Sequence, residues 1–276
     1  VTIKVFGVGG GGNSVLKRMA ESNFLNIDLV AVNTDAHALT QMNMGAIKTV
    51  QIGEPLTKGR GTGGNVLVGE QSAKNDATRL KNMMLGADMI FVTAGMGGGT
   101  GTGAAPIVAG IAKEEGILTV AVVTKPFRFE GKVRMQRALN GISKLYPNVD
   151  TLISIANDKL LNIVDVKDGF REAFAKADVI LKQSIRGITD LINLPALVNL
   201  DFADVATVMR GKGLAHIAIG EGQGENKVSD AIKKAMESPL LDTTIDGATD
   251  IIVSICGEVS LVDVDAAMRE VEPKLS

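Results

Sequence analysis

The residues with the clearest chemical potential in this sequence are glycines. The chain of 276 residues contains 32 of them, and they concentrate at Gly7–Gly12, Gly59–Gly64 and Gly95–Gly103. Glycine has no Cβ, so it adopts left-handed backbone conformations and lets backbone N–H groups approach a ligand closely. Successive N–H groups in such loops bind anions, phosphate above all. The clusters therefore predict a site for a phosphate-bearing ligand.

The first cluster, Gly7–Gly12, follows a strand-like apolar segment, precedes a helical one and satisfies the pattern G-x-G-x-x-G. Asn33 and Asp35 lie about 20 residues further on, where a dinucleotide-binding fold places its ribose-binding acid. Taken alone, this pattern favours an NAD site, and a tight turn without a ligand is the alternative.

The second cluster, Gly95–Gly103, lies between a strand-like segment and the start of a helical one. Nearly side-chain-free amides, the positive end of a helix and the hydroxyls of Thr100 and Thr102 suit a polyanionic phosphate. An NAD-binding domain needs one such loop, whereas two loops indicate a longer phosphate chain held from both sides. The pattern G-x-x-x-x-G-K-[ST] does not occur, which excludes a Walker-type NTPase.

The second cluster also matches the tubulin signature G-G-G-T-G-[ST]-G, and the chain resembles the tubulin/FtsZ family, in particular its bacterial cell-division members. The resemblance covers essentially the whole chain and continues through Ala31–Ala36, Pro126–Gly131, Asn157–Leu161 and Asn199–Val205. It implies a cytoplasmic GTPase that polymerises head to tail into the cell-division ring. It also implies GTP or GDP as the nucleotide, with Mg²⁺ held mainly by phosphates and water.

The nucleotide-binding residues that the resemblance implies lie in both glycine loops and in three later segments. Glu130 and Arg134, one helical turn apart, would reach the ribose and the phosphates, and a surface i,i+4 ion pair is the alternative. The loop residues are Gly10, Gly11, Gly12, Asn13, Ser14, Gly97, Gly98, Gly99, Thr100, Gly101 and Thr102.

The base would be read by Asn157 and Asp178. A carboxylate accepts hydrogen bonds from both N1–H and the exocyclic amine of guanine, whereas adenine offers no such pair of donors. This makes GTP the expected substrate rather than ATP. Phe174, one turn before Asp178, is placed to lie against the purine ring. A core phenylalanine on an apolar stripe is the alternative.

The catalytic residues that the resemblance implies are Asn199, Asp201 and Asp204. They would complete the nucleotide site of the next subunit in the filament, where the two carboxylates orient the attacking water and Asn199 assists. Helix capping is the alternative, with Asp201 as the N-cap and Asp204 at position N3. Hydrolysis would then require assembly, because an isolated subunit lacks the water-positioning residues.

The partners implied by the resemblance are other copies of the chain, together with division proteins and membrane tethers. These would bind a C-terminal tail that is absent from this chain, since Ser276 falls short of the family's final strands. Val1 is not an initiator methionine, which indicates trimmed ends.

The elements that must position these residues have the pattern of an α/β fold. In the first half, Val/Ile-rich strands alternate with amphipathic helices, which is typical of a parallel sheet with helices on both faces and ligands at the carboxyl ends of the strands. We expect a Rossmann-like, tubulin-type GTP-binding domain at residues 1–167, a long central helix at 168–193, and a smaller α/β domain at 194–276. Within the last, we expect strands at 216–221 and 251–257.

Composition excludes several other functions. Lys and Arg number 29 and Asp and Glu 31, so the net charge is 29 − 31 = −2, which removes the electrostatic basis for binding nucleic acid. The single cysteine, Cys256, fits a reducing compartment, and His37 and His216 form no local metal motif. No apolar run reaches the ~18 residues that a membrane-spanning helix needs, so we expect no direct membrane insertion.

Two other functions remain as alternatives. One is a tubulin-like filament protein that shapes cells or segregates DNA, and the motifs around Asn157 and Asn199 favour division over it. The other is an NAD-dependent oxidoreductase built on Gly7–Gly12. An NAD site needs only one glycine loop, so this alternative does not explain Gly95–Gly103.

Overall fold

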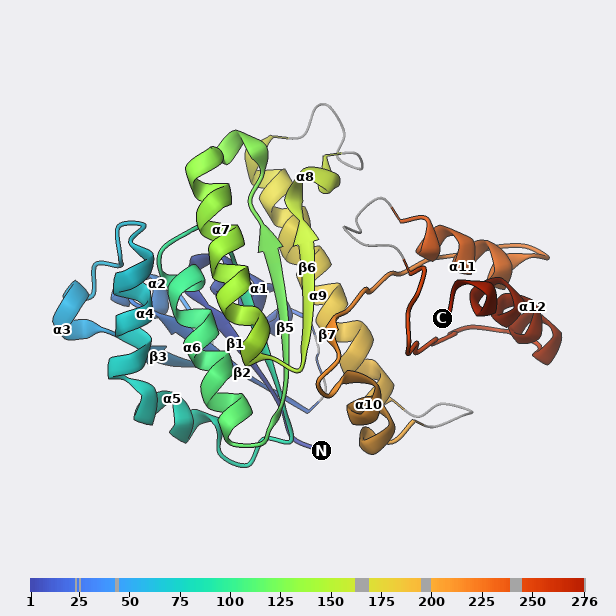
Figure 1. Cartoon of the computed structure of the whole chain (residues 1–276), viewed down its shortest axis with the longest axis horizontal. Helices are drawn as coiled ribbons and strands as arrows, with labels where there is room; N and C mark the ends of the chain where they lie inside the picture. Colours follow the sequence, from blue (N-terminus) through green and yellow to red (C-terminus); the bar gives the residue numbers. More distant parts are fainter. Residues whose placement is uncertain are drawn as a thin grey trace. The chain divides into compact units, whose positions relative to one another are not determined.

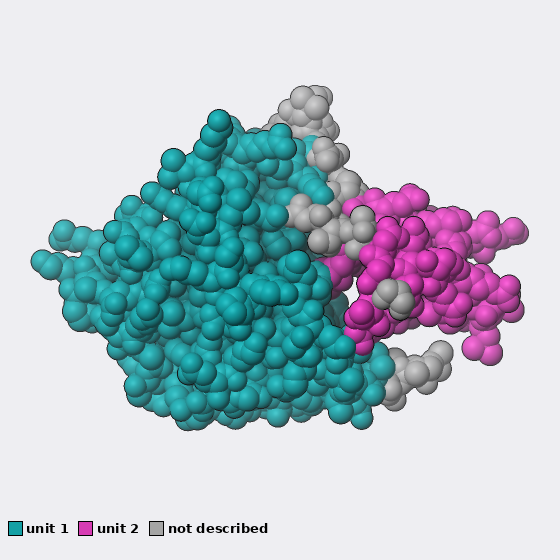
Figure 2. Space-filling view, in the orientation of Figure 1, with its two compact units in different colours: residues 1–215 teal, residues 216–276 magenta. Residues whose placement is uncertain are grey.

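The computed structural model describes residues 1–22, 24, 26–42, 45–161, 169–194, 200–238 and 245–275. The chain divides into two compact units, Val1–Ala215 and His216–Ser276 (Figures 1 and 2). The three-part division proposed from the sequence, with boundaries after residues 167 and 193, stays a proposal. None of the helices in the described ranges combines the length and the hydropathy that a membrane crossing needs.

Within the described residues, unit 1 forms a seven-stranded sheet in which every neighbouring pair of strands is parallel. The spatial order is β3-β2-β1-β4-β5-β6-β7, and the central strands are buried on both faces. This confirms the expected α/β class. The strands are β1 (Ile3–Val8), β2 (Ile27–Asn33), β3 (Ile47–Gln51), β4 (Met89–Gly95), β5 (Leu118–Lys125), β6 (Thr151–Ala156) and β7 (Gly213–Leu214).

The helices of unit 1 lie between these strands along the chain. Helices α1 and α6 begin inside the two glycine clusters, at Gly9 and Thr100, so glycines of these clusters form their first helical turns. The helices are α1 (Gly9–Ala20), α2 (Ala36–Thr40), α3 (Glu54–Thr57), α4 (Val66–Asn75), α5 (Ala77–Met84), α6 (Thr100–Glu114), α7 (Lys132–Leu145), α8 (Asn157–Leu160), α9 (Phe170–Asn193) and α10 (Phe202–Met209), with short 3-10 turns at Arg128–Glu130 and Tyr146–Asn148.

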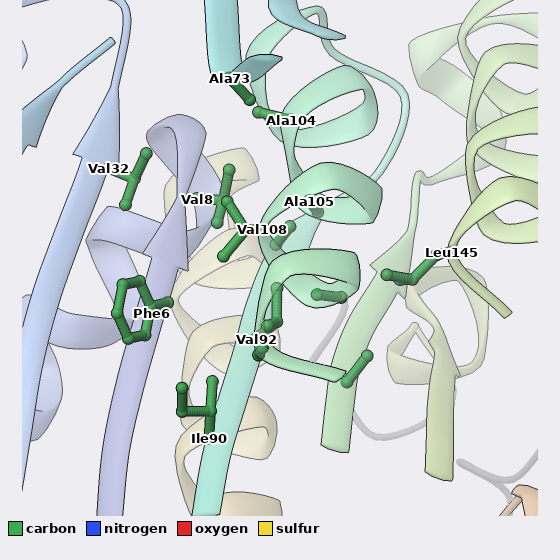
Figure 3. Close-up of a cluster of buried hydrophobic side chains, with 14 of the residues drawn as sticks. Phe6, Val8, Val32, Ala73, Ile90, Val92, Ala104, Ala105, Val108 and Leu145 are labelled. Carbon is green, nitrogen blue, oxygen red and sulfur yellow. The ribbon is translucent and has the colours of Figure 1, made fainter. Parts of the chain in front are cut away.

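Helices cover both faces of the sheet. On one face, alternate strand residues pack against α6, including Phe6 and Val8 of β1 (Figure 3). The intervening residue, Gly7, faces α1, since a Cβ there would lie 2.6 Å from Cγ of Leu16. Figure 1 shows α6 and α7 in front of the sheet and α9 behind it. This alternation follows from the two-residue period of a strand.

The long helix expected at 168–193 is present as α9, which contains 24 residues. Its core-facing side includes Ala177, Leu181 and Ile185, which are buried. However, Phe170 and Phe174 are 69% and 40% exposed, so the apolar stripe does not continue into the core at this end. The reason is that the first turns of α9 pack on the aromatic loop after β5 instead of on the sheet.

Unit 2 contains α11 (Lys227–Met236) and α12 (Leu261–Val271), followed by a 3-10 turn at Glu272–Lys274. The strands expected at 216–221 and 251–257 are wrong, because the described residues of unit 2 form no strand. Val253 and Ile255, two residues apart, do pack on the helices. The two-residue apolar period is therefore real, but a strand also needs a neighbouring strand with which its backbone groups can pair.

Candidate nucleotide-binding site

The two glycine loops meet at the carboxyl edge of the sheet. A Cβ at Gly9 would lie 2.7 Å from the backbone N of Gly101, and one at Gly11 would lie 3.0 Å from the backbone N of Gly95. Gly9 and Gly97 also have positive φ values of 73° and 110°. Only glycine permits such close approach in these conformations. The first turns of α1 and α6 are consequently held against each other.

Neither of these two helix starts is neutralised by a side chain. The N-cap residues are Val8 for α1 and Gly99 for α6, neither makes a side-chain cap hydrogen bond, and neither first turn contains an acidic residue. By contrast, Asn65 caps α4 through its side chain. Free N–H groups and the positive ends of two helix dipoles therefore gather at one place. This arrangement favours a polyanion.

Gly10 and Gly98 differ from the other loop glycines. At Gly12 and Gly99 a Cβ would collide with Thr93 and Thr62, so packing requires glycine there. No atom lies within 4 Å of a Cβ at Gly10, and the nearest at Gly98 is Nη2 of Arg134 at 4.0 Å. Neither residue has a positive φ. The fold therefore gives no reason for glycine at these two positions, whereas a ligand lying against the backbone does.

Hydrogen bonds of threonine side chains hold the second glycine loop in place. The hydroxyls of Thr100 and Thr34 are 2.8 Å apart, and the backbone N–H of Gly97 donates to Oγ1 of Thr102 at 2.7 Å. Both threonine positions in the loop are buried. Thr102 therefore stabilises the loop through its side chain, while the Thr100 hydroxyl contacts Thr34, the residue after β2.

Asn13 holds the first loop from within α1. Its amide donates to the carbonyl of Gly7 at 2.8 Å and accepts from the amide of Asn33 at 2.8 Å. Asn13 is 4% exposed, whereas Ser14 lies exposed on the outer side of the helix. Asp35, the candidate ribose acid of an NAD site, instead caps α2 by accepting from the N–H of Ala38 at 3.0 Å.

Arg134 links the second loop to α7. Its Nε lies 2.9 Å from Oε1 of Glu130, so the i,i+4 ion pair considered from the sequence is present. The other oxygen of Glu130 accepts from the N–H of Phe127 at 2.8 Å. A Cβ at Gly97 would lie 2.8 Å from Cγ of Arg134, so the arginine stem runs along the loop. The ion pair thus holds a guanidinium beside the second glycine loop.

Asn157 follows β6 at the same edge of the sheet. It is 4% exposed, and its Oδ1 is buried with no hydrogen-bond partner among the described residues. Leaving such an acceptor unpaired costs about 1–3 kcal/mol. A ligand with a donor group would remove that cost.

Phe174 belongs to a cluster of aromatic rings from α9 and the loop after β5. Its ring meets that of Phe127 edge to face, with centroids 5.3 Å apart, and Phe127 stacks on Phe129 at 4.8 Å. Since Phe174 is 40% exposed, its position does not fit the core alternative. An exposed ring here offers a surface to a flat ligand.

Asp178 lies between α9 and α1. Its Oδ2 accepts from Nε of Arg18 at 3.1 Å, and its side chain is 17% exposed. Burial raises the pKa of Asp178 above its ordinary value, and the hydrogen bond and charge of Arg18 offset only part of this effect. A carboxylate has two oxygens, so Oδ1 is left to accept from a ligand.

The proposed catalytic acids lie on α10. Asp201 is the N-cap and forms a capping box with Asp204: its Oδ1 accepts from the N–H of Asp204 at 2.9 Å, and its own N–H donates to Oδ2 of Asp204 at 3.1 Å. The geometry that the capping alternative requires is therefore present. Both acids are exposed. Asn199 lies outside the described residues.

The placement of α10 separates these acids from the glycine loops of the same chain. Thr151, the first residue of β6, donates through Oγ1 to the carbonyl of Met209 at 2.6 Å, and the N–H of Gly211 donates to Asp150 at 3.2 Å. Helix α10 is thus attached at the amino edge of the sheet, and Figure 1 shows it at the end of α9 away from α8. A six-residue strand is about 20 Å long, so the two sets of residues lie at opposite edges.

Comparison with known proteins assigns the chain to a family. Residues 2–165 match the tubulin/FtsZ family GTPase domain, and residues 213–276 match the FtsZ family C-terminal domain. An empty FtsZ dimer from M. jannaschii superposes with a TM-score of 0.89 at 41% identity, covering 99% of this chain and 80% of that chain. The chain belongs to the tubulin/FtsZ family.

Two solved structures with lower identity share the fold. CetZ2 from Haloferax volcanii, solved as a GTPγS-bound protofilament, superposes with a TM-score of 0.78 at 22% identity and covers 99% of this chain and 85% of that chain. GDP-bound CetZ1 from the same organism has a TM-score of 0.75 at 20% identity, with 90% and 78% covered.

Some residues of this tubulin/FtsZ-family site are not apparent from the sequence. Arg18, the partner of Asp178, is 160 residues away in the chain, and no local pattern marks it. Thr34 lies in the segment Ala31–Ala36, whose motif could have identified it. No group of His, Cys, Asp or Glu in the described ranges is arranged to hold a metal ion.

Proposed function

We propose that this chain binds GTP at the two glycine loops, polymerises head to tail, and hydrolyses GTP at the contact between successive subunits. The observation that carries the proposal is the meeting of two uncapped helix starts, with Gly10 and Gly98 open to the outside. A triphosphate supplies the negative charge that this place lacks. Arg134 adds a guanidinium for the phosphates, held in position by Glu130.

The guanine base would lie between α9 and the end of β6. The buried Oδ1 of Asn157 would accept a hydrogen bond from the base, and Asp178 would accept from N1–H and the exocyclic amine. Phe174 would lie against the ring. Asn157 and the second glycine loop follow β6 and β4, which are two strands apart, so they are separated by about 10 Å along the sheet edge.

Hydrolysis would use acids from a neighbouring subunit. Because α10 is attached at the amino edge, the carboxyl edge of one chain would have to meet the amino edge of the next for Asp201 and Asp204 to reach a nucleotide. Such a heterologous contact repeats without closing and yields a filament. The two exposed carboxylates would orient the attacking water, with Asn199 assisting, while the loop amides stabilise the charge that develops on the phosphates.

The remaining parts of the proposal concern the metal and the cell. Mg²⁺ would be held mainly by nucleotide phosphates and water, and the filaments would form the cell-division ring in the cytoplasm. Division proteins and membrane tethers would attach through a C-terminal tail. The 41% identity to FtsZ, against 22% to CetZ2, favours division over a role in cell shape or DNA segregation. An oxidoreductase is disfavoured because Asp35 is committed to capping α2.

Sedimentation with different nucleotides tests the proposal. GTP in the presence of Mg²⁺ is expected to convert the chain into a pelletable polymer and to release phosphate, whereas ATP and NAD at the same concentration do neither. Equal responses to GTP and ATP would contradict the assignment of Asn157 and Asp178 to the base.

Nucleotide affinity is expected to depend on pH through Asp178. Only the ionised carboxylate accepts from both donors of guanine, so GDP binding should weaken as the pH falls through the pKa of Asp178 in the nucleotide-free protein. Since burial raises that pKa, the loss should begin at a higher pH than for an ordinary aspartate, whose pKa is about 3.9. Below the pKa of Asp178, the loss should approach about tenfold per pH unit. Calorimetric titration of GDP from neutral pH down to the lowest pH at which the protein stays folded measures the loss.

Protonation of Asp178 does not weaken GDP binding by unfolding the protein. A carboxyl with a raised pKa stabilises the fold at low pH, and this contribution is lost as the pH rises through the folded pKa.

Inosine diphosphate, which lacks the exocyclic amine, provides the matched control. The parent should prefer GDP to it, and Asp178→Asn should lose both this preference and the pH dependence. Retention of either in Asp178→Asn would show that another group reads the base.

A further inference from the structure

A groove lies beside the candidate nucleotide site, where the loop before α4 approaches the middle of α7. Its volume is about 430 Å³, within the usual range for small-molecule sites. One wall is residues 63–67, and the other is Arg137, Asn140, Gly141 and Lys144. In Figure 1, α6 lies between α4 and α7.

The α7 wall presents donors without acids. Arg137, Asn140 and Lys144 follow the spacing i, i+3, i+7, which places them on one helical face over about 10 Å. The segment 132–146 contains no Asp or Glu. Arg137 has no ion pair among the described residues, and it reaches across the groove, since a Cβ at Gly64 would lie 3.3 Å from its Nη1.

Lys144 closes one end of the groove. Its Nζ lies 3.0 Å from Oε2 of Glu70 on α4, and Glu70 also pairs with Lys74 at 2.6 Å. These two lysines lower the pKa of Glu70. Glu70 is thus shared between two cations, so Lys144 retains positive charge for a further anion. The cationic side of the groove is therefore centred on Arg137 and extends to Lys144.

Both walls of the groove contact the second glycine loop. Gly69 of α4 packs on Gly99, and Gly103 of α6 packs on Val66. On the other wall, Gly141 packs so closely on Thr102 and Met96 that a side chain would collide there. A ligand that bridges the walls would therefore fix both elements that support the loop from Gly97 to Gly103.

We propose that this groove binds a small organic anion carrying two or more carboxylates or phosphates, and that its occupancy is linked to nucleotide affinity at the second glycine loop. Arg137 and Asn140 would bind one anionic group and Lys144 another, with Val66 and Leu67 against the carbon skeleton. Because linkage is reciprocal, the anion and the nucleotide would change each other's affinity by the same factor.

Equilibrium dialysis of labelled citrate against the whole chain tests the proposal, at fixed ionic strength, without Mg²⁺, and with or without saturating GDP. We expect saturable binding of one citrate in the presence of GDP, weakened about tenfold or more by Arg137→Gln. Lys132→Gln is the matched control, since it removes a charge on the same helix about 140° around from Arg137. It should change citrate affinity less than twofold. Inorganic phosphate, dialysed in parallel, should bind more weakly because it cannot span both cations.

The outcomes separate the site, the linkage and the proposed function. Absence of saturable citrate binding, or equal affinity in the parent and Arg137→Gln, would overturn the site. Citrate bound at the glycine loops instead would be displaced by GDP and would survive Arg137→Gln. Citrate binding with no change in GDP affinity would overturn the linkage. Failure of GDP to bind at all would contradict the proposed function, and the comparison of Arg137→Gln with Lys132→Gln would still decide the groove.

Discussion

Asp204→Asn is expected to reduce GTP turnover by about a hundredfold or more while GTP binding and the fold are retained. Positioning of the attacking water and electrostatic stabilisation supply most of the catalysis of phosphoryl transfer, so loss of a water-orienting carboxylate has a large effect. The amide preserves the capping box, because its oxygen can still accept from the N–H of Asp201. Phosphate release per assembled subunit, together with thermal unfolding, measures the two properties separately.

The capping box at the start of α12 supplies the matched control. Ser260 and Asp263 make the same reciprocal bonds at the start of α12, where Asp263 is half-buried and Asp204 is exposed. Asp263→Asn should leave turnover within twofold of the parent. If Asp204→Asn also retains the parent's turnover, capping is the whole role of Asp204 and the catalytic assignment is wrong. Asp201→Asn should behave like Asp204→Asn, since Asn and Asp are equally good N-caps.

Gly10→Ala is expected to weaken GTP binding by about a hundredfold or more without destabilising the protein. No atom lies within 4 Å of the added methyl group and the φ of Gly10 is not positive, so the fold accommodates alanine. Alanine in place of glycine at a compatible position typically raises the free energy of unfolding by about 0.4–1 kcal/mol. The methyl group would nevertheless occupy the space through which phosphate reaches the backbone N–H groups.

Gly99→Ala provides the contrast within the same site. A Cβ there collides with Oγ1 of Thr62 and lies 2.9 Å from the backbone N of Asn65, so this variant should lose both stability and binding. Calorimetric titration with GTP and denaturant unfolding of both variants make the comparison. Parent-like GTP affinity in Gly10→Ala would show that no ligand lies against this part of the loop.

The sheet and the phosphate loops could be predicted from the sequence because their causes are local. Runs of Val and Ile bounded by glycine indicate buried parallel strands, and glycine before a helical segment indicates a loop that approaches a ligand. The starts of α1 and α6 within the glycine clusters are harder to predict. Glycine has low helix propensity, yet contact between the two loops overrides that propensity in the first turn.

The base-reading part of the site was less accessible from the sequence. Burial between α1 and α9 raises the pKa of Asp178, and the hydrogen bond from Arg18 offsets part of that rise. Arg18 and Asp178 are 160 positions apart in the chain, so no local pattern reveals their contact. The unpaired oxygen of Asn157 also depends on what surrounds it in the fold. Periodicity placed Phe174 on an apolar stripe, whereas tertiary packing left it 40% exposed beside other aromatic rings.

Helix capping and catalysis are both compatible with the residues at the start of α10. The acids Asp201 and Asp204 satisfy both, so neither their spacing nor the observed capping box distinguishes the two roles. The two roles differ in whether the acids act within their own subunit or on the nucleotide of a neighbouring subunit. A cap acts within its own helix, whereas acids at the amino edge of the sheet reach a nucleotide only across a subunit contact.

Mixing two inactive variants tests this shared site most directly. Gly10→Ala subunits lack bound GTP but present Asp201 and Asp204, while Asp204→Asn subunits bind GTP but lack a complete acid pair. In a 1:1 mixture, about a quarter of the contacts join a filled nucleotide site to an intact acid pair. GTPase activity should therefore reappear and rise steeply with total protein concentration. If the two variants sediment together in one polymer and the mixture stays as inactive as each variant alone, hydrolysis does not depend on acids from a neighbouring subunit.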